Sequence, residues 1–248
     1  MDVLVRTFNS AATLEECLAS VRARFPVERL LVIDRDSTDA TREIASRFGA
    51  EVHTEDVGIG RATRLALAAA STDRVLFLDS DVTLCRSDFA VAALGAMRDP
   101  RVGAVVGTAI GHRFFYGLPL GLTVLPRAWA RGIEMPDGAQ GAETYYLRRA
   151  LAREGLRVAY VPEAMRHRGT YRGGDWPEWQ GAQVRIAAGW SLAELSNSLS
   201  VILLLHMNSR RAVDLAYTPV FVAKFFRGFL RPERWRLRDR RRAGPTSA

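Results

Sequence analysis

The chain has 248 residues, 48% of them hydrophobic and 25% charged, which is enough for one large α/β domain or for a domain with an appendage. Its formal net charge is +8, carried almost entirely by arginine, which indicates either a coding bias or a surface that meets phosphates. Two cysteines exclude a disulfide framework and have no zinc-like spacing, and no apolar segment approaches the ~18 residues needed to cross a bilayer.

Strand-like and helix-like segments alternate through the first part of the chain. Apolar, β-branched runs predict strands, and apolar residues at helical spacing predict helices. In chain order we expect strands at 2–6, 29–34, 50–55 and 73–79, and between them helices at 11–25, 37–49 and 60–71. This alternation predicts a mainly parallel sheet with helices on both faces, in which ligands bind beyond the carboxyl ends of the strands.

The later segments are less regular. We expect a strand at 101–110, a loop with a short strand at 114–132, a flexible loop at 135–143, a helix at 144–155, an edge or terminal strand at 156–164, and a basic, aromatic loop at 165–179. From about residue 180 the pattern changes to two helical segments, 191–207 and 215–230, followed by an arginine run at 231–242. The sequence therefore predicts a division between residues 1–180 and 181–248.

The segment VLFLDSDVTL, residues 75–84, ends an apolar strand in two carboxylates, Asp79 and Asp81. One chemistry for this pattern is phosphoryl transfer, as in haloacid-dehalogenase-type phosphatases. That reaction needs a cation for the phosphate and further carboxylates downstream, but the single lysine, Lys224, lies near the end of the chain and residues 174–179 lack a second aspartate at the required offset. The other chemistry is a nucleotide-sugar site, where such carboxylates hold Mg²⁺ or Mn²⁺ against a diphosphate leaving group. The second chemistry is favoured.

Three successive stretches carry a family resemblance. VRTFNSAATLEECLASV, VIDRDSTDAT and GIGRATRLALAAASTDRVLFLDSDV together resemble family-2 glycosyltransferases of the GT-A fold, over roughly residues 2–170. The resemblance implies a GT-A-type, Rossmann-like α/β fold with a C-terminal helical appendage. It also implies a nucleobase pocket bordered by Thr7, Phe8 and Asn9, with Asp34 bonding the base edge. Further along, the segment expected to approach the diphosphate contains Gly58, Gly60, Arg61 and Arg64.

The same resemblance assigns the metal site and shows one departure. It implies that Asp81 is the direct metal ligand, that Asp79 lies nearer the ribose and also belongs to the metal site, and that His167 is the third ligand. Ser80, between the two aspartates, is expected to bind the nucleotide sugar. The second block in the family usually reads Asp-Asp-Gly-Ser-x-Asp, whereas this chain reads Asp-Arg-Asp-Ser-Thr-Asp from residue 34. Arg35 and Asp36 thus replace an acid and a glycine, and the choice between uracil and guanine stays open.

The downstream half supplies the expected catalytic base. The family often reads Glu-Asp-x-x-Leu, and this chain keeps Glu143 but has Thr144 in place of the aspartate. Glu143 is therefore the expected base, with Asp137 as the fallback, removing a proton from the acceptor hydroxyl in a single displacement with inversion. Trp176 and Trp179 are expected to contact the acceptor.

The C-terminal segments are too short or too interrupted to span a bilayer. They either pack on the catalytic domain or lie in the plane of a membrane, with the apolar faces and the basic residues of 191–242 meeting anionic head groups. Nucleic-acid binding is not expected, because no recognition motif accompanies the arginine run. The sequence begins without a secretory leader, so we expect a cytoplasmic protein, peripheral at the cytoplasmic face of the membrane.

Together these patterns predict a metal-dependent inverting glycosyltransferase that uses Mn²⁺ or Mg²⁺. The donor is a UDP- or GDP-linked sugar and the acceptor is a lipid-linked or cell-envelope glycan, such as a polyprenyl phosphate carrier. The catalytic domain is expected at 1–180, with a nucleotide-binding half (1–100) and an acceptor half (101–180), followed by amphipathic helices and a basic tail at 181–248. The alternative is a nucleotide-sugar-binding relative with impaired catalysis. This alternative stays open because Thr144 replaces the second acid of the family pattern.

Overall fold

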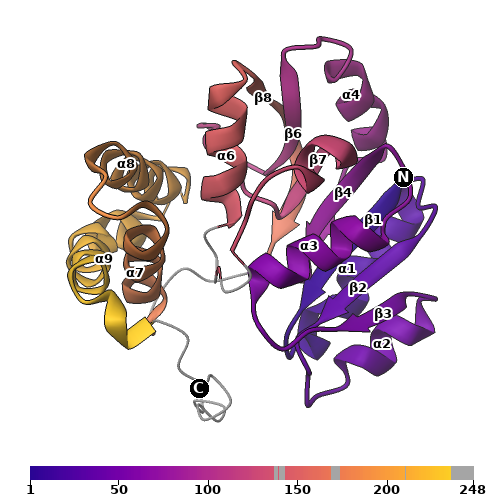
Figure 1. The fold of residues 1–248 in the computed structure, drawn as a ribbon, viewed down its shortest axis with the longest axis horizontal. Helices are drawn as coiled ribbons and strands as arrows, with labels where there is room; N and C mark the ends of the chain where they lie inside the picture. Colours follow the sequence, from indigo (N-terminus) through magenta and orange to yellow (C-terminus); the bar gives the residue numbers. More distant parts are fainter. Residues whose placement is uncertain (137–138, 140–142, 169–173, 210, 236–248) are drawn as a thin grey trace. The chain divides into compact units, whose positions relative to one another are not determined.

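The computed structural model of the chain describes residues 1–136, 139, 143–168, 174–209 and 211–235 (Figure 1). The chain divides into two compact units, residues 1–170 and 171–248, which we call the α/β unit and the helical unit. The predicted boundary at residue 180 falls inside a helix, α7 (Trp176–Ala188), so this prediction is corrected by about ten residues. The reason is that α7 packs along α9 (Ala212–Leu230), so both helices belong to the second unit.

The first half of the α/β unit follows the predicted alternation. Strands β1 (Asp2–Thr7), β2 (Leu30–Asp34), β3 (Glu51–Thr54) and β4 (Arg74–Asp79) pair in parallel, with β1 between β2 and β4. The connecting helices are α1 (Ala11–Arg24), α2 (Thr41–Arg47) and α3 (Ile59–Ala69). Every residue of β2 is buried, as expected for a strand covered on both faces.

The second half of this unit completes a mixed sheet. It adds β5 (Val82–Leu84), α4 (Phe89–Ala96), β6 (Val102–Ala109), β7 (Leu122–Pro126), α5 (Arg127–Arg131), α6 (Glu143–Arg153) and β8 (Arg157–His167). The strand order is β3-β2-β1-β4-β7-β6-β8-β5. Strand β7 is antiparallel to both of its neighbours and β5 is antiparallel to β8, so four of the seven pairings are parallel.

Strand β8 differs from the sequence-based expectation. It is neither an edge strand nor finished at residue 164, because it lies between β6 and β5 and continues to His167. A register shift between β6 and β8 at Gly107 and Ala109, together with a positive φ of 55° at Glu163, bends the strand. Beyond the bend, residues 165–167 pair with the short edge strand β5.

Two hydrophobic cores lie on the two faces of the sheet. The alternation along β1 sends Val3 and Val5 to one face, where they meet the buried residues of α1, α2 and α4. Leu4 points to the other face, where α3, α5 and α6 cover the sheet. The prediction of an α/β sheet with helices on both faces is confirmed.

The helical unit contains α7, α8 (Leu192–Asn208), α9 (Ala212–Leu230) and a 3₁₀ turn (Pro232–Trp235). Its core is formed by Ile202, Phe221, Phe225 and Phe229. Helices α7 and α9 cross with backbones in contact, since a Cβ atom added at Gly181 would lie 1.9 Å from the Phe225 carbonyl oxygen. Within the described part of the chain, every helix is too short or too polar to cross a membrane.

Candidate active site

Polar side chains gather at the carboxyl ends of the central strands. The register pairs Arg6 of β1 with Asp79 of β4, and Thr7 with Asp34 of β2, so the ends of three strands lie side by side. Asp79 is the last residue of β4, and Asp81 lies in the short turn that leads into β5. The sheet therefore brings the Asp-x-Asp carboxylates to the edge where parallel α/β sheets bind ligands.

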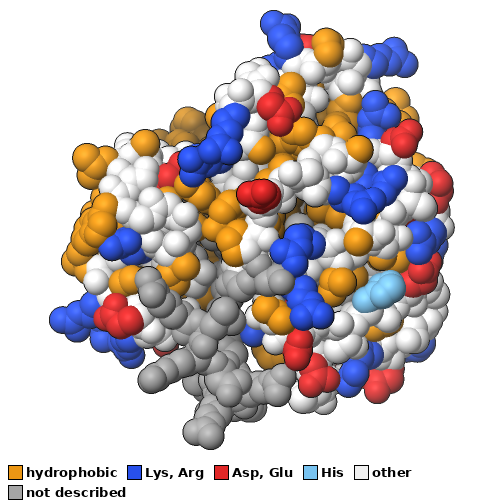
Figure 2. Space-filling model, in the orientation of Figure 1, with side chains coloured by type: hydrophobic (Ala, Val, Ile, Leu, Met, Phe, Trp, Pro, Cys, Tyr) orange, Lys and Arg blue, Asp and Glu red, His pale blue; other side chains and the backbone are white. Residues whose placement is uncertain are grey.

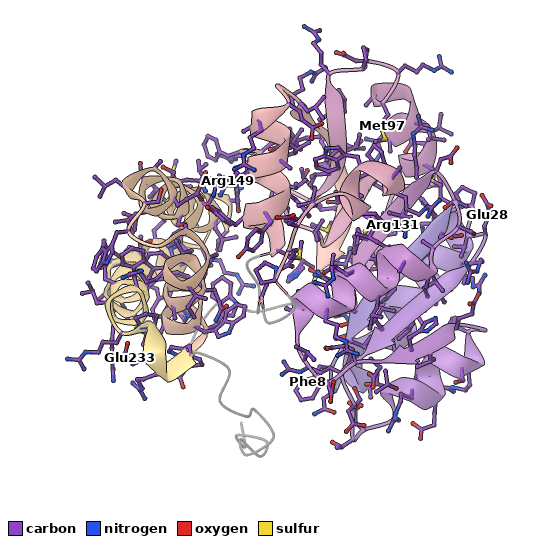
Figure 3. All side chains as sticks on the ribbon, in the orientation of Figure 1. Phe8, Glu28, Met97, Arg131, Arg149 and Glu233 are labelled. Atoms are coloured by element: carbon purple, nitrogen blue, oxygen red, sulfur yellow. The ribbon has the colours of Figure 1, made fainter. Side chains whose placement is uncertain are left out.

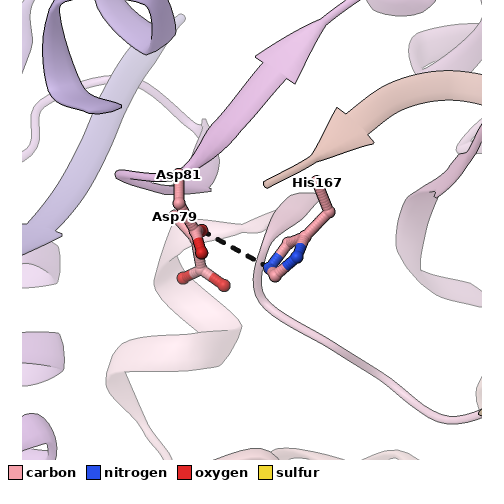
Figure 4. Close-up of side chains that lie close together, drawn as sticks. All are labelled: Asp79, Asp81 and His167. Atoms are coloured by element: carbon pink, nitrogen blue, oxygen red, sulfur yellow. Dashed lines mark ion pairs between the residues drawn. The ribbon is translucent and has the colours of Figure 1, made fainter. Parts of the chain in front are cut away.

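His167 reaches the same place from the far end of β8. The pairing of β5 with β8 sets Val82 opposite His167, and the backbone N–H of Arg168 donates to the Asp81 carbonyl oxygen at 3.0 Å. This brings His167 Nε2 within 3.4 Å of Asp81 Oδ1 (Figure 4). The bend at Glu163 is what turns the end of β8 toward β5, as β-bulges beside functional sites often do.

The three side chains can serve as a set of metal ligands. One ligand atom from each of Asp79, Asp81 and His167 lies within 4.8 Å of the other two. All three are partly exposed, so a cation can reach them from solvent. Two carboxylates with one imidazole form a mainly hard donor set, which fits Mg²⁺ or Mn²⁺. The structure thus brings together the three residues that the sequence resemblance assigned to the metal.

Arg6 connects this cluster to the expected base. Its guanidinium donates to Glu143 Oε1 at 2.8 Å and to Asp79 Oδ1 at 3.4 Å, and it also contacts Thr63 Oγ1. Burial alone would lower the pKa of Arg6, but the carboxylates of Glu143 and Asp79 outweigh this effect and raise the pKa above its ordinary value. Arg6 was not among the site residues expected from the sequence, although a charged residue at the end of an apolar strand was a usable signal.

Glu143 is the first residue of α6 and is buried. Its Oε1 atom is held by Arg6, whereas Oε2 is buried and has no hydrogen-bond partner among the described residues. An orphaned buried carboxylate oxygen is costly, so it commonly marks a group that acts on a ligand. The fallback base, Asp137, lies outside the described residues.

Gly121 supports Asp79 from behind and was not anticipated from the sequence. The Asp79 N–H donates to the Gly121 carbonyl oxygen at 3.0 Å. A Cβ atom at Gly121 would lie 3.1 Å from Asp79 Oδ2 and 3.7 Å from Val82 Cγ2. Any residue other than glycine at position 121 would therefore force the Asp79 carboxylate to shift.

The predicted nucleobase residues lie together at the ends of β1 and β2. The fully buried Asp34 accepts hydrogen bonds from Thr7 Oγ1 at 2.7 Å, Ser37 Oγ at 2.6 Å and the Ser37 N–H at 2.8 Å. Phe8 is exposed, and Asn9 Oδ1 accepts from the Thr38 N–H at 2.9 Å. These bonds show that Asp34 fixes the turn after β2. A direct bond from Asp34 to a base stays a prediction.

The segment expected to meet the diphosphate begins helix α3. The Gly58 N–H donates to Glu55 Oε2 at 2.8 Å, and the Gly60 N–H donates to the Ala139 carbonyl oxygen at 2.9 Å. Arg61 and Arg64 are both exposed, and Arg64 donates to the Met135 carbonyl oxygen at 2.9 Å. Their contact with a diphosphate stays a prediction.

Three further features lie near the residues expected to bind the donor. Ser80 Oγ donates to Ser10 Oγ at 2.9 Å, which ties the Asp-x-Asp turn to the start of α1. Burial lowers the pKa of His112, and nearby His167 lowers it further, so His112 is a neighbour of the metal cluster that sequence reasoning did not single out. A cavity of about 570 Å³ beside Arg64 and Tyr146 is separate from the Asp-x-Asp carboxylates.

The two tryptophans expected at the acceptor belong to helix α7 in the helical unit. The Trp176 ring packs edge-on against Phe221 with 5.5 Å between centroids, and both tryptophans are half-buried. Packing within their own unit accounts for Trp176, and an acceptor contact by either residue stays a prediction.

The fold and the site define a class of protein. An α/β sheet of this order, with Asp-x-Asp and a histidine at its carboxyl edge, is that of a GT-A-type nucleotide-sugar transferase. The model of glycosyl transferase family 2 matches residues 2–123. This match spans just under half of the chain, and it confirms the sequence-based resemblance to the family through that region.

Curated relatives match the same part of the chain. An N-acetylglucosaminyltransferase of Bradyrhizobium elkanii is 33% identical over 121 residues, which cover 44% of this chain and 66% of the relative. Another, from Rhizobium meliloti (strain 1021), is 36% identical over 118 residues, covering 43% of this chain and 28% of the relative. An uncharacterized glycosyltransferase of Mycobacterium tuberculosis is 40% identical over 76 residues, covering 30% of this chain and 35% of the relative. These matches thus span two thirds or less of each relative.

Solved structures share the fold. A mannosyltransferase from Pyrobaculum calidifontis, in complex with GDP-Man and Mn²⁺, superposes with a TM-score of 0.70 at 18% identity, covering 94% of this chain and 86% of that one. Glucosyl-3-phosphoglycerate synthase from Mycobacterium tuberculosis, in complex with Mn²⁺, UDP-glucose and phosphoglyceric acid, has a TM-score of 0.61 at 24% identity, covering 79% of each chain. At these identities the likeness establishes the GT-A fold.

Proposed function

We propose that this chain is a metal-dependent inverting glycosyltransferase that moves a sugar from a nucleoside diphosphate donor to an acceptor hydroxyl. The observation that carries the proposal is the convergence of Asp79 and Asp81, at the end of β4, with His167, at the end of β8; their ligand atoms lie within 4.8 Å of one another. Similar proteins support it, since relatives are named N-acetylglucosaminyltransferases and structural neighbours hold UDP-glucose or GDP-Man with Mn²⁺.

In the proposed reaction Asp81, Asp79 and His167 would hold Mn²⁺ or Mg²⁺, which supplies positive charge for the departing diphosphate. Glu143 accepts a proton at Oε2 from the acceptor hydroxyl, while Arg6 holds Oε1 in place. The acceptor oxygen forms a bond to the anomeric carbon as the bond to the nucleoside diphosphate breaks. Attack on the face opposite to the leaving group inverts the anomeric configuration.

We propose that the acceptor is lipid-linked and that the helical unit binds the anionic membrane surface in which the acceptor lies. Figure 2 shows hydrophobic side chains on the surface of this unit, at the left of the view, with basic side chains beside them. Leu192 is 79% exposed at the start of α8, and a groove of about 370 Å³ lined by leucines and serines follows along the same helix. Exposed Arg211 and Arg231 flank α9. Apolar side chains with neighbouring arginines suit in-plane association with anionic lipids.

Nucleotide binding tests the proposed catalytic function. Isothermal titration with UDP and with GDP, each with and without Mn²⁺, should show binding that Mn²⁺ strengthens. Asp81→Asn should abolish the Mn²⁺ effect, whereas Asp73→Asn, an exposed carboxylate just before the opposite end of β4, should leave it unchanged. Equal Mn²⁺ effects in wild type and Asp81→Asn would refute the metal site. A donor-hydrolysis assay on Glu143→Gln then separates a working base from a nucleotide-binding relative, because an equal rate in both proteins excludes Glu143 as the base.

Flotation with phosphatidylglycerol vesicles tests the membrane proposal. Leu192→Asp should reduce the floated fraction, whereas Val91→Asp, at a position 74% exposed on α4 of the α/β unit, should not. Equal flotation of both variants and of wild type would contradict this use of α8.

A further inference from the structure

The loop after β2 has two side chains that the nucleotide site described so far does not use. Arg35 lies over the exposed ring of Phe8, with 5.9 Å from its guanidinium carbon to the ring centroid, and its backbone N–H donates to the Thr7 carbonyl oxygen at 2.9 Å. Phe8 is 46% exposed and projects beyond the end of β1 (Figure 3). An aromatic face and a planar guanidinium are thus held together at the edge where the nucleobase is expected.

Asp36 has an unusual backbone conformation. Its φ is +50°, in the left-handed region that side chains other than glycine seldom adopt. Its side chain is 73% exposed, and within the described residues its nearest charged partner is Arg42, at 3.9 Å. The related pattern has glycine at this position, which would adopt the same φ without strain. A strained residue that presents an exposed carboxylate is a reason to look for a ligand.

The other two carboxylates of this loop are already engaged. Asp34 is fully buried and accepts three hydrogen bonds from Thr7 and Ser37. Asp39 accepts from the Ala11 N–H at 3.0 Å and from Thr41 Oγ1 at 2.5 Å. Asp36 makes no hydrogen bond with its side chain to any described residue, so among the acids at 34–39 it is the one whose oxygens can accept from a ligand.

We propose that Phe8, Arg35 and Asp36 select guanine over uracil in the donor. The inference rests on the proposed nucleotide-sugar function of this site. Guanine presents two adjacent donors, N1–H and the 2-amino group, which one carboxylate can accept as a parallel pair, and its O6 and N7 atoms are acceptors for arginine. Uracil presents one N–H between two carbonyl oxygens, so a carboxylate that accepts the N–H faces a repelling oxygen lone pair. The larger purine also covers more of the Phe8 ring.

Titration calorimetry with GDP, IDP and UDP in the presence of Mn²⁺ tests the selection. IDP has hypoxanthine, which lacks the 2-amino group and retains N1–H, so it removes one of the two hydrogen bonds to Asp36. Wild type should bind GDP at least about tenfold more tightly than UDP, with IDP between them. Asp36→Gly should lose about tenfold in GDP affinity, bind GDP and IDP equally and keep its UDP affinity, while the matched variant Asp73→Asn should behave as wild type.

Each result has a definite meaning. The Asp36→Gly variant removes a strained backbone position, so it should fold at least as stably as wild type, and a loss of GDP binding cannot be assigned to misfolding. If wild type binds UDP as tightly as GDP, or if Asp36→Gly still separates GDP from IDP, guanine selection by Asp36 is wrong while the nucleotide-sugar function stands. If none of the three nucleotides binds, both the selection and the proposed function are wrong.

Discussion

Replacing Gly228 with alanine tests how helices α7 and α9 hold the helical unit together. A Cβ atom at Gly228 would lie 1.7 Å from the Glu178 carbonyl oxygen and 2.6 Å from its carbonyl carbon. Ordinary contact begins near 3.4 Å, so the two helices would have to separate by about 1.7 Å at this point. Because the obstacle is backbone, no side-chain rotation can relieve the overlap.

The expected cost follows from what this separation disturbs. The core beside the crossing consists of Ile202, Phe221, Phe225 and Phe229, and the last two lie on either side of Gly228 along α9. Overpacking a core typically costs about 1–3 kcal/mol, and a rigid backbone obstacle belongs at the upper end of that range. We therefore expect Gly228→Ala to lower the free energy of unfolding of the helical unit by about 3 kcal/mol.

Urea unfolding followed by tryptophan fluorescence measures this change. Four of the five tryptophans, Trp176, Trp179, Trp190 and Trp235, belong to the helical unit, so fluorescence reports mainly on it. The matched control is Gly95→Ala in α4, where a new Cβ meets nothing within 4 Å and alanine should stabilise the helix by up to about 1 kcal/mol. An unchanged urea midpoint in Gly228→Ala would refute the close helix crossing.

Two further predictions concern the metal site and pH. Gly121→Ala places a Cβ 3.1 Å from Asp79 Oδ2, so the carboxylate must shift by a few tenths of an ångström. We expect the Mn²⁺-dependent gain in nucleotide affinity, measured by calorimetry, to fall about tenfold. An undiminished gain would contradict a ligand role for Asp79. Burial lowers the pKa of His206, partly opposed by Asp214, so the unfolded chain takes up the proton more readily than the folded one. The contribution of His206 to the free energy of unfolding should therefore be full above the ordinary histidine pKa of about 6.5 and be lost as the pH falls below it. The urea midpoint of wild type should drop between about pH 7.5 and 5.5. The drop should be smaller in His206→Gln, whereas the control His53→Gln, at an exposed position, should show the wild-type drop.

The parallel half of the sheet could be predicted because its signals are local. Strands β1, β2 and β4 are short apolar runs, and helices separate successive strands from β1 to β4. The polar residues at the carboxyl ends of these three apolar strands indicated where a ligand would bind. The proximity of His167 to Asp79 and Asp81 was expected for a different reason, since His167 came from a motif resemblance. Nothing in the local pattern indicates that β8 bends at Glu163 to pair with the three-residue strand β5.

The electrostatic partners could not be predicted, because they depend on long-range contacts. Arg6 belongs to the first strand, whereas its main partner, Glu143, is the first residue of helix α6 in the second half of the α/β unit. Asp34 was predicted to face the base, but the sequence gives no sign that Thr7 and Ser37 would engage both of its oxygens. Side-chain hydrogen bonds between distant segments decide which carboxylate stays available, and periodicity does not report them.

The charges of the site account for why a cation should be needed at all. The site holds three carboxylates and one guanidinium, because Arg6 forms ion pairs with Asp79 and Glu143, while Asp81 lies beside His167. With a neutral histidine the cluster therefore carries a surplus of two negative charges, and a nucleoside diphosphate brings more of the same sign. Arg6 offsets little of the diphosphate charge, because its guanidinium is already shared between Glu143 and Asp79. A divalent cation at Asp81 removes the surplus, so we expect the cation and the donor to bind cooperatively.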